Sequence, residues 1–249
     1  MFDLSGKTCV VTGANTGIGQ GLALGLASAG ANIVAVGRSQ PEETRAQVED
    51  TGCKFAFVEA DLGDISSVPA VVEKAEAAFG LPAVLVNNAG TIKRNDALDF
   101  TEEEWDSVMD VNLKTLFFLS QGFAKRWVAA GERGKIINIA SMLSYQGGIR
   151  VASYTASKSG VMGLTRLLAN EWAAKKINVN AIAPGYIATN NTAALRADEK
   201  RNAEILGRIP AGRWGDPSDL SGAAIFLAST ASDYVHGTTL PVDGGWLAR

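Results

Sequence analysis

The chain has 249 residues, and its 23 basic and 26 acidic side chains give a net charge of −3, which argues against nucleic acid or an anionic membrane as main partner. One histidine, His236, and two cysteines without a C-x-x-C spacing, Cys9 and Cys53, argue against a metal site and a disulfide. Because no apolar run approaches membrane-spanning length and no linker divides the chain, we expect a cytoplasmic protein with residues 1–249 in one domain.

Short β-branched runs alternate with longer amphipathic stretches, a pattern typical of parallel strands joined by helical crossovers. The pattern predicts an α/β fold, a single-domain doubly wound (Rossmann) sheet of seven parallel strands with helices on both faces. A (β/α)₈ barrel of similar length is the alternative. The predicted strands are Thr8–Val11, Asn32–Val36, Lys54–Val58, Ala83–Val86, Lys135–Ile139, Asn178–Ile182 and Thr238–Val242. The predicted helices are Ile18–Ala29, Pro41–Asp50, Ser66–Phe79, Asn112–Ala130, Ser153–Ala174 and Pro217–Ala228, and the charged run Arg196–Arg201 also has a helical pattern.

The first strand ends in a glycine-rich turn, V-V-T-G-A-N-T-G-I-G, with Gly13, Gly17 and Gly19. In a doubly wound sheet this turn lets the backbone approach a pyrophosphate at the helix N-terminus, and residues without a Cβ permit that approach. The turn therefore favours a dinucleotide-binding sheet over the barrel. The alternative is that Gly17 and Gly19 only allow close packing of the helix against the strand.

Polar residues follow the fourth and fifth strands, at the edge where open α/β sheets bind ligands. The stretch N-N-A-G, Asn87–Gly90, follows the fourth strand and is also compatible with an ordinary turn. Ser141 ends the fifth strand, and Tyr154 and Lys158 follow on one face of a helix, four residues apart. A phenol works as an acid–base near neutral pH when a nearby cation stabilises its anion, which Lys158 can do. The alternative is a solvent-facing Tyr and Lys.

These motifs occur in a fixed order: T-G-A-N-T-G-I-G, N-N-A-G, Asn112 in V-N-L, Ser141, Y-T-A-S-K and P-G-Y-I-A-T. Together they resemble the short-chain dehydrogenase/reductase family along the whole chain. The resemblance implies an NAD(P)-dependent oxidoreductase acting on CH–OH groups, with a tetrad of Asn112, Ser141, Tyr154 and Lys158. In it Tyr154 is the acid–base, and Lys158 lowers its pKa and holds the nicotinamide ribose. Ser141 positions the carbonyl or alcohol, and Asn112 holds a water.

The resemblance also implies a cofactor site. It places Ile187 and Thr189 near the carboxamide and pyrophosphate, and Asp61 near the adenine amino group. Taken alone, Asn112 is equally compatible with a helix N-cap, and P-G-Y-I-A-T with a plain loop. The expected cofactor-binding residues are Gly13, Asn15, Thr16, Gly17, Ile18, Gly19, Arg38, Ser39, Asp61, Leu62, Asn88, Ala89, Gly90, Tyr154, Lys158, Pro184, Gly185, Ile187 and Thr189.

The end of the second strand, V-A-V-G-R-S, bears on the choice of nicotinamide. An acidic residue there accepts hydrogen bonds from the ribose 2′-hydroxyl of NAD, whereas this chain has Gly37 followed by Arg38 and Ser39. Arg38 can pair with a 2′-phosphate, and Ser39 can add a donor. Thr16 stands where NADP-preferring relatives often carry a cation. We predict NADP(H), with NAD(H) tolerated; a solvated Arg38 is the alternative.

Within the family the chain resembles most the dehydrogenases of deoxy sugar acids, and the substrate expectation depends on that resemblance. A carboxylate with several hydroxyls needs cations and hydrogen-bond donors near the catalytic tyrosine. Each candidate is also compatible with a surface or subunit contact, and a substrate-loop segment is expected at about residues 186–215. The candidate substrate residues are Arg94, Gln146, Arg150 and Trp214, with Arg213 beside the last.

Two expectations concern partners and rival functions. The terminal G-G-W-L-A-R places an aromatic where a monomer would fray, so docking on a neighbour and a homotetramer are expected, as in relatives. One rival function is a 3-oxoacyl thioester reductase, which a cationic patch for a carrier protein would favour, and Lys125 and Arg126 alone do not establish one. The other is a non-catalytic dinucleotide-binding protein, which predicts a damaged tetrad.

Overall fold

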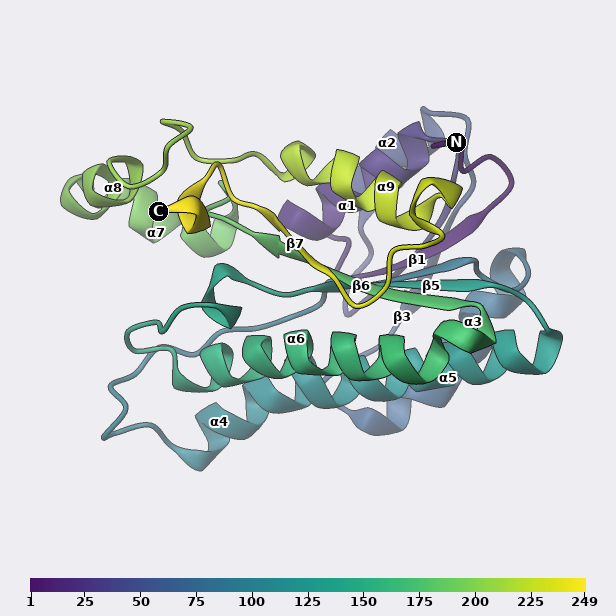
Figure 1. The fold of residues 1–249 in the computed structure, drawn as a ribbon, viewed down its shortest axis with the longest axis horizontal. Helices are drawn as coiled ribbons and strands as arrows, with labels where there is room; N and C mark the ends of the chain where they lie inside the picture. The colour runs from purple at the N-terminus through teal and green to yellow at the C-terminus, as the bar shows by residue number, and fades with distance from the viewer.

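Seven strands form one parallel sheet in the computed structural model, which describes residues 1–249. Their order is β3-β2-β1-β4-β5-β6-β7, so the sheet is open and the chain reverses its direction of winding between β1 and β4 (Figure 1). The expected doubly wound fold is confirmed, and the barrel alternative is wrong. The strands are β1 (Thr8–Thr12), β2 (Asn32–Gly37), β3 (Phe55–Glu59), β4 (Val84–Asn87), β5 (Gly134–Ile139), β6 (Ile177–Pro184) and β7 (Thr239–Val242).

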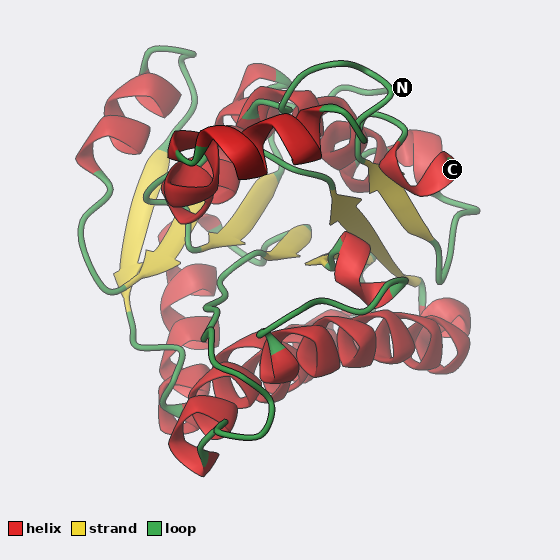
Figure 2. Cartoon of the chain, turned by 90° about the vertical axis from the view of Figure 1, so that its left-hand side faces the viewer, coloured by secondary structure: helices red, strands yellow, loops and turns green.

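Helices cover both faces of the sheet, which gives three layers (Figure 2). They are α1 (Gly17–Ser28), α2 (Glu42–Glu49), α3 (Val68–Phe79), α4 (Glu102–Met109), α5 (Leu116–Ala130), α6 (Ala152–Trp172), α7 (Ala193–Ala197), α8 (Glu199–Leu206) and α9 (Ser221–Ala228). Val11 of β1 packs in one core cluster with Leu22 of α1, while the adjacent Val10 packs in another with Phe123 of α5. Successive residues of a strand therefore point to opposite faces of the sheet. Because helices cover both faces, the strands are apolar throughout.

The expected strands all occur, with bounds that move by at most two residues, but α4 was not predicted. Thr101 caps α4: its side chain accepts a hydrogen bond from the Glu104 backbone, and the Glu104 carboxylate accepts one from the Thr101 backbone. This T-x-x-E capping box is visible in the sequence and could have revealed the helix. The helical pattern expected at Arg196–Arg201 is present but broken at Asp198, which caps α8.

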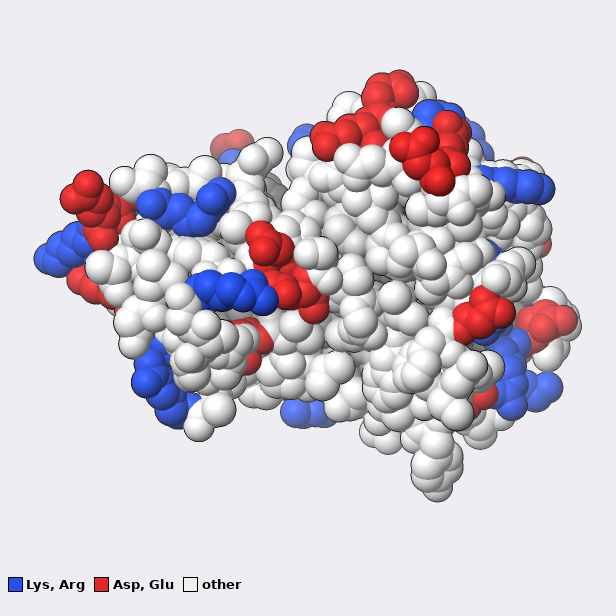
Figure 3. Space-filling view, turned by 90° about the horizontal axis from the view of Figure 1, so that it is seen from above, with Lys and Arg blue, Asp and Glu red and all other residues white.

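The charged side chains are dispersed over the surface. On the face shown in Figure 3, acidic and basic groups are interspersed and most of the face is uncharged, in keeping with the net charge of −3. No helix combines the length and the apolar character needed to cross a membrane. Both cysteines are free, and no group of histidine, cysteine and carboxylate side chains is arranged to hold a metal ion.

Candidate active site

The glycine turn lies at the carboxyl end of β1, next to the switch in winding. Gly13 and Gly17 have φ of 67° and 58°, which side chains rarely adopt. A Cβ on Gly19 would lie 2.0 Å from the carbonyl oxygen of Gly13, so Gly19 does permit close helix packing. A Cβ on Gly17 would lie 3.2 Å from Cγ2 of Thr189. The turn and the P-G-Y-I-A-T segment thus face each other across the N-terminus of α1, where a pyrophosphate can be held.

The N-N-A-G stretch is bound to the end of β1. The Thr12 hydroxyl accepts hydrogen bonds from the backbone of Asn88 at 3.0 Å and of Ala89 at 2.9 Å. The side-chain amide of Asn88 donates to the Thr12 carbonyl at 2.9 Å. Asn88 therefore shapes the glycine turn with its side-chain nitrogen, and a Cβ on Gly13 would lie 3.1 Å from that nitrogen.

Three expected tetrad residues meet at the carboxyl end of β5. Ser141 follows the strand, and its hydroxyl is close enough to the Tyr154 phenol on α6 to act on the pKa of that group. One turn further along α6, the Lys158 ammonium lies 5.6 Å from the centroid of the Tyr154 ring. Lys158 is buried and donates to the carbonyl of Ile139 at 2.6 Å. The structure thus excludes the alternative of a solvent-facing Tyr and Lys pair.

Burial dominates the titration of both groups on α6. Burial raises the pKa of Tyr154, while the Ser141 hydrogen bond and the charge of Arg94 act to lower it. Burial lowers the pKa of Lys158 to about 8. Burial outweighs the two lowering effects, so the pKa of the Tyr154 phenol lies above its ordinary value in this structure.

Asn112 lies inside a continuous helical run and does not cap a helix. A π-helical segment, Asp110–Thr115, joins α4 directly to α5, so the N-cap alternative is wrong and the helix predicted from Asn112 begins earlier. The Asn112 amide donates to the Thr91 carbonyl at 3.0 Å and to the Ser157 hydroxyl at 3.2 Å. Its oxygen accepts from the Thr91 backbone at 2.8 Å. This fully buried side chain thereby joins the loop after N-N-A-G to α6, and π segments are frequent at functional sites.

The end of β2 presents an exposed cation. Arg38 is exposed and forms no ion pair, so its guanidinium is free to bind an anion. The Asn15 amide donates to the carbonyl of Ser39 and to its hydroxyl, the latter at 3.1 Å. A Cβ on Gly37 would lie 2.8 Å from the Asn15 side-chain oxygen, so a side chain at position 37 would displace the Asn15 amide. Asp61, beyond β3, is also exposed.

The candidate substrate residues divide into two groups. Arg94 is exposed and close enough to Tyr154 for its charge to act on the phenol. Gln146 follows Ser141 on the same loop, and its amide nitrogen has no hydrogen-bond partner. Arg150 instead pairs with Asp96 at 3.3 Å.

The remaining two candidates, Arg213 and Trp214, form hydrogen bonds within the expected substrate-loop segment or with the residues that follow it. The Trp214 indole donates to Asn202 at 2.7 Å, and Arg213 forms a two-pronged pair with Asp219 at 2.7 and 2.9 Å. The geometry therefore favours Arg94 and Gln146 for substrate contact over Arg150, Arg213 and Trp214.

Trp246 was not among the expected site residues. The expectation that docking on a neighbouring chain orders this C-terminal residue is wrong. It is buried within its own chain, 6% exposed, in a cluster with Met142, Ile205 and Ile209. Its indole nitrogen donates to the side-chain oxygen of Gln146 at 3.0 Å. The C-terminus thus lies beside α7 and α8 (Figure 1), and docking on a neighbour is not needed to order it.

Comparison with known proteins agrees with this geometry. The family described as enoyl-(acyl carrier protein) reductase matches residues 13–247. The 2-dehydro-3-deoxy-D-gluconate 5-dehydrogenase of Escherichia coli is 64% identical over 248 residues, covering 100% of this chain and 98% of the relative. A putative 2-deoxy-D-gluconate 3-dehydrogenase from Agrobacterium tumefaciens, solved with bound NADP, is 58% identical with a TM-score of 0.95, covering 100% and 99%. With the glycine turn and the Ser-Tyr-Lys arrangement, these matches establish that the chain belongs to the short-chain dehydrogenase/reductase family of NAD(P)-dependent oxidoreductases.

Proposed function

We propose that this enzyme transfers a hydride between NADP(H) and a secondary alcohol or ketone of a deoxy sugar acid, with Tyr154 as acid–base. The observation that carries the proposal is the convergence of Ser141, Tyr154 and buried Lys158, with the Lys158 ammonium 5.6 Å from the Tyr154 ring, at the sheet edge that holds the glycine turn. The names of the relatives support 2-dehydro-3-deoxy-D-gluconate or 2-deoxy-D-gluconate as substrate.

Each tetrad residue has a role that its position allows. Bound nicotinamide accepts or supplies the hydride. In the oxidation direction Tyr154 takes the proton of the substrate hydroxyl, while Ser141 holds that oxygen by a hydrogen bond. Lys158 stabilises the phenolate and holds the nicotinamide ribose. Asn112, buried between the Thr91 loop and α6, keeps these elements in register, and the family resemblance assigns it a water of the proton relay.

The cofactor site is built from the carboxyl ends of β1, β2 and β4. Gly13, Gly17 and Thr189 cradle the pyrophosphate at the N-terminus of α1. Arg38 pairs with the 2′-phosphate of NADP, and Gly37 stands where an acidic residue would select NAD. Bound NADP in the Agrobacterium structure supports this choice. NAD(H) is expected to be tolerated as well.

The substrate site combines a cation with a neutral donor. Arg94 binds the carboxylate, and the Gln146 amide donates to a hydroxyl. A 3-oxoacyl thioester reductase would use the same tetrad, but its carrier protein needs a cationic docking patch, and Arg126 already pairs with Glu76 at 3.0 Å. A non-catalytic dinucleotide-binding protein would not need the contact between Ser141 and Tyr154 to be kept.

The test is a reduced-nicotinamide absorbance assay with four reactions: 2-dehydro-3-deoxy-D-gluconate and 2-deoxy-D-gluconate, each with NADP⁺ and with NAD⁺. Turnover that is fastest with NADP⁺ on one sugar acid is the expected result. Silence in all four, in protein that binds dinucleotide, would overturn the substrate assignment. Faster reduction of a 3-oxoacyl thioester would favour the alternative.

We also propose a homotetramer in the cytoplasm. The long helices α5 and α6 expose apolar side chains, with Phe118, Val128 and Leu167 at 40%, 50% and 46% exposure, and such a face is stabilised when a second copy covers it. The two free cysteines suit a reducing compartment. Light scattering on purified protein measures the mass, and a monomer at micromolar concentration would contradict the assembly.

A further inference from the structure

A second charged cavity lies at the amino edge of the sheet, opposite the edge that carries the tetrad. Its volume is about 220 Å³. The cavity is lined by three cations, one carboxylate, one hydroxyl and two methyl groups, namely Lys7, Arg133, Lys135, Asp233, Thr230, Ala83 and Ala228. Nothing in the proposed reaction uses these residues.

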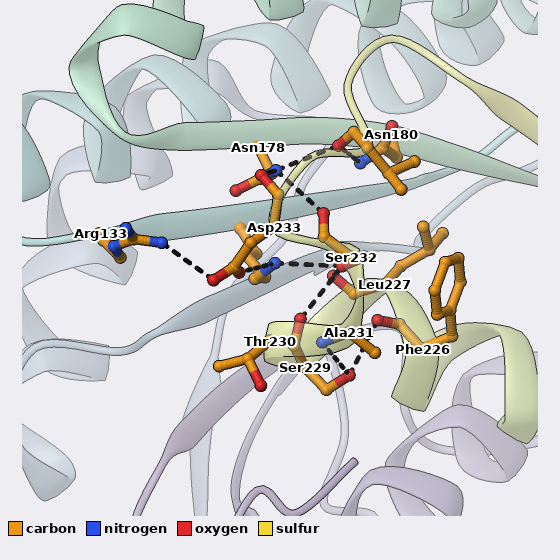
Figure 4. A network of polar contacts seen from close by, with 12 residues as sticks. Arg133, Asn178, Asn180, Phe226, Leu227, Ser229, Thr230, Ala231, Ser232 and Asp233 are labelled. Carbon is orange, nitrogen blue, oxygen red and sulfur yellow. Dashed lines mark hydrogen bonds and ion pairs between the residues drawn. The ribbon is translucent and has the colours of Figure 1, made fainter. Parts of the chain in front are cut away.

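The topology explains why the cations converge. Lys7 immediately precedes β1, Arg133 immediately precedes β5, and Lys135 is the second residue of β5. Parallel strands all begin at the same edge, so residues distant in sequence lie together there. Asp233 reaches the same place from the turn after α9, where it directly follows the short helix Thr230–Ser232 (Figure 4).

Lys135 is the unusual member of this cluster. Its side chain is only 9% exposed, and its ammonium donates to Ser232 at 3.1 Å and pairs with Asp233 at 2.9 Å. Burial lowers its pKa, with smaller opposing effects from Asp233 and further lowering by the charges of Lys7 and Arg133. A buried ammonium near two other cations is costly unless an anion compensates it.

Asp233 compensates only part of this charge. Its other carboxylate oxygen pairs with Arg133 at 3.0 Å (Figure 4), and Lys7 forms no ion pair. The charges of Lys7 and Arg133 lower the pKa of Lys135, and the charge of Asp233 raises it. Three cations and one carboxylate therefore line the cavity, so the lining carries two more positive than negative charges, and Asp3, outside the lining, acts on Lys7.

We propose that this cavity binds a phosphate group, as inorganic phosphate or as a small phosphomonoester. A dianion matches the two excess positive charges of the lining, and its oxygens accept hydrogen bonds from Lys7, from the nitrogens of Arg133 that Asp233 leaves free, and from the third ammonium hydrogen of Lys135. Because phosphate would join the strand edge to the turn after α9, its binding also stabilises the fold.

The experiment is a calorimetric titration with inorganic phosphate and, separately, with glycerol phosphate. Lys7→Gln and Arg133→Gln are suitable variants because Arg133 is 68% exposed and Lys7 is half-buried at the surface, so the core stays intact. Each is expected to weaken phosphate binding roughly fivefold to tenfold, and together they abolish it. Binding of glycerol phosphate at least as tightly as phosphate assigns the site to a phosphomonoester; the reverse order assigns it to free phosphate.

Lys125→Gln is the matched control, since it removes one exposed cation from the surface of α5. It is expected to leave phosphate binding unchanged and phosphate-induced thermal stabilisation intact. The proposal is overturned if wild type binds no phosphate, if the Lys7→Gln, Arg133→Gln double variant binds it as wild type does, or if binding is lost only in an Arg38→Gln variant. The last result would place the anion in the cofactor site.

Discussion

The indole nitrogen of Trp246 donates a hydrogen bond to the side-chain oxygen of Gln146 at 3.0 Å, across 100 positions of the chain. An indole can only donate, so this bond fixes which atom of the Gln146 amide faces it and turns the NH₂ group away. Arg208 stacks 4.1 Å from the Trp246 ring, and Tyr186 packs on it at 4.8 Å. The C-terminus thus orients a donor on the loop that follows Ser141.

Trp246→Phe keeps an aromatic ring in the cluster and removes the indole donor, so the Gln146 amide is free to rotate. The KM for the sugar acid is expected to rise about tenfold, the size of one lost hydrogen bond to an oriented donor, with kcat changed less than about twofold. Steady-state kinetics measure both constants. Trp105→Phe, on the exposed face of α4, is the control and should match wild type; an unchanged KM in Trp246→Phe would show that Gln146 needs no such support.

Tyr154→Phe tests the acid–base role. Loss of the phenol oxygen is expected to lower kcat by roughly 10²–10⁴-fold, while dinucleotide affinity stays within about twofold, because the ring and its packing remain. Single-turnover assays and fluorescence titration with reduced cofactor give the two quantities. Wild-type turnover by a variant that binds cofactor normally would remove Tyr154 from the mechanism.

Much of the fold was predictable because the apolar run that forms each strand can be recognised from the sequence of that strand alone. Strands such as β1 and β4 are covered on both faces, so each reads as an unbroken apolar run. Helix α4 was missed because it buries only Val108 and its first turn is acidic throughout, which hides the helical period. The capping box at Thr101 was the better signal there.

The site was predictable where the spacing of two residues in the sequence determines their relative positions in space. Four residues on a helix place Tyr154 and Lys158 on one face whatever surrounds them. The π segment around Asn112 was not predictable, since it depends on partners in the Thr91 loop and on α6 that only the tertiary structure provides. For the same reason the contact between Trp246 and Gln146 was not predictable, since the two residues lie 100 positions apart in the chain.

Arg38→Asp tests the choice of cofactor. The change removes a two-pronged phosphate ligand and adds a repelling charge, so NADP⁺ affinity is expected to fall roughly 100-fold and NAD⁺ affinity to change less than about threefold. Lys125→Asp makes the same charge reversal on the exposed surface of α5 and should alter neither. Equal losses for both cofactors in Arg38→Asp would contradict a specific contact with the 2′-phosphate.

Lys158→Met is expected to make the cofactor-free enzyme more stable at pH 7 while abolishing turnover. Burial lowers the pKa of Lys158 from 10.5 to about 8, which corresponds to roughly 3 kcal/mol of cost to folding with the lysine charged. Between those two pKa values the unfolded chain binds more protons than the folded one, so wild-type stability rises with pH there. The cost is complete below pH 8 and disappears as the pH approaches 10.5.

The stability difference between Lys158→Met and wild type should therefore depend on pH. The variant also loses the hydrogen bond to Ile139, worth about 1 kcal/mol, which leaves a net gain near 2 kcal/mol and a rise in Tm of about 4–8 °C at pH 7. Scanning calorimetry from pH 7 to pH 10 should show this difference shrinking as wild type sheds its buried charge. A variant less stable than wild type at pH 7, or a difference constant with pH, would mean that the ammonium is already compensated in the fold. The expected result would show that Lys158, which the reaction needs, destabilises the folded enzyme, as active-site residues commonly do.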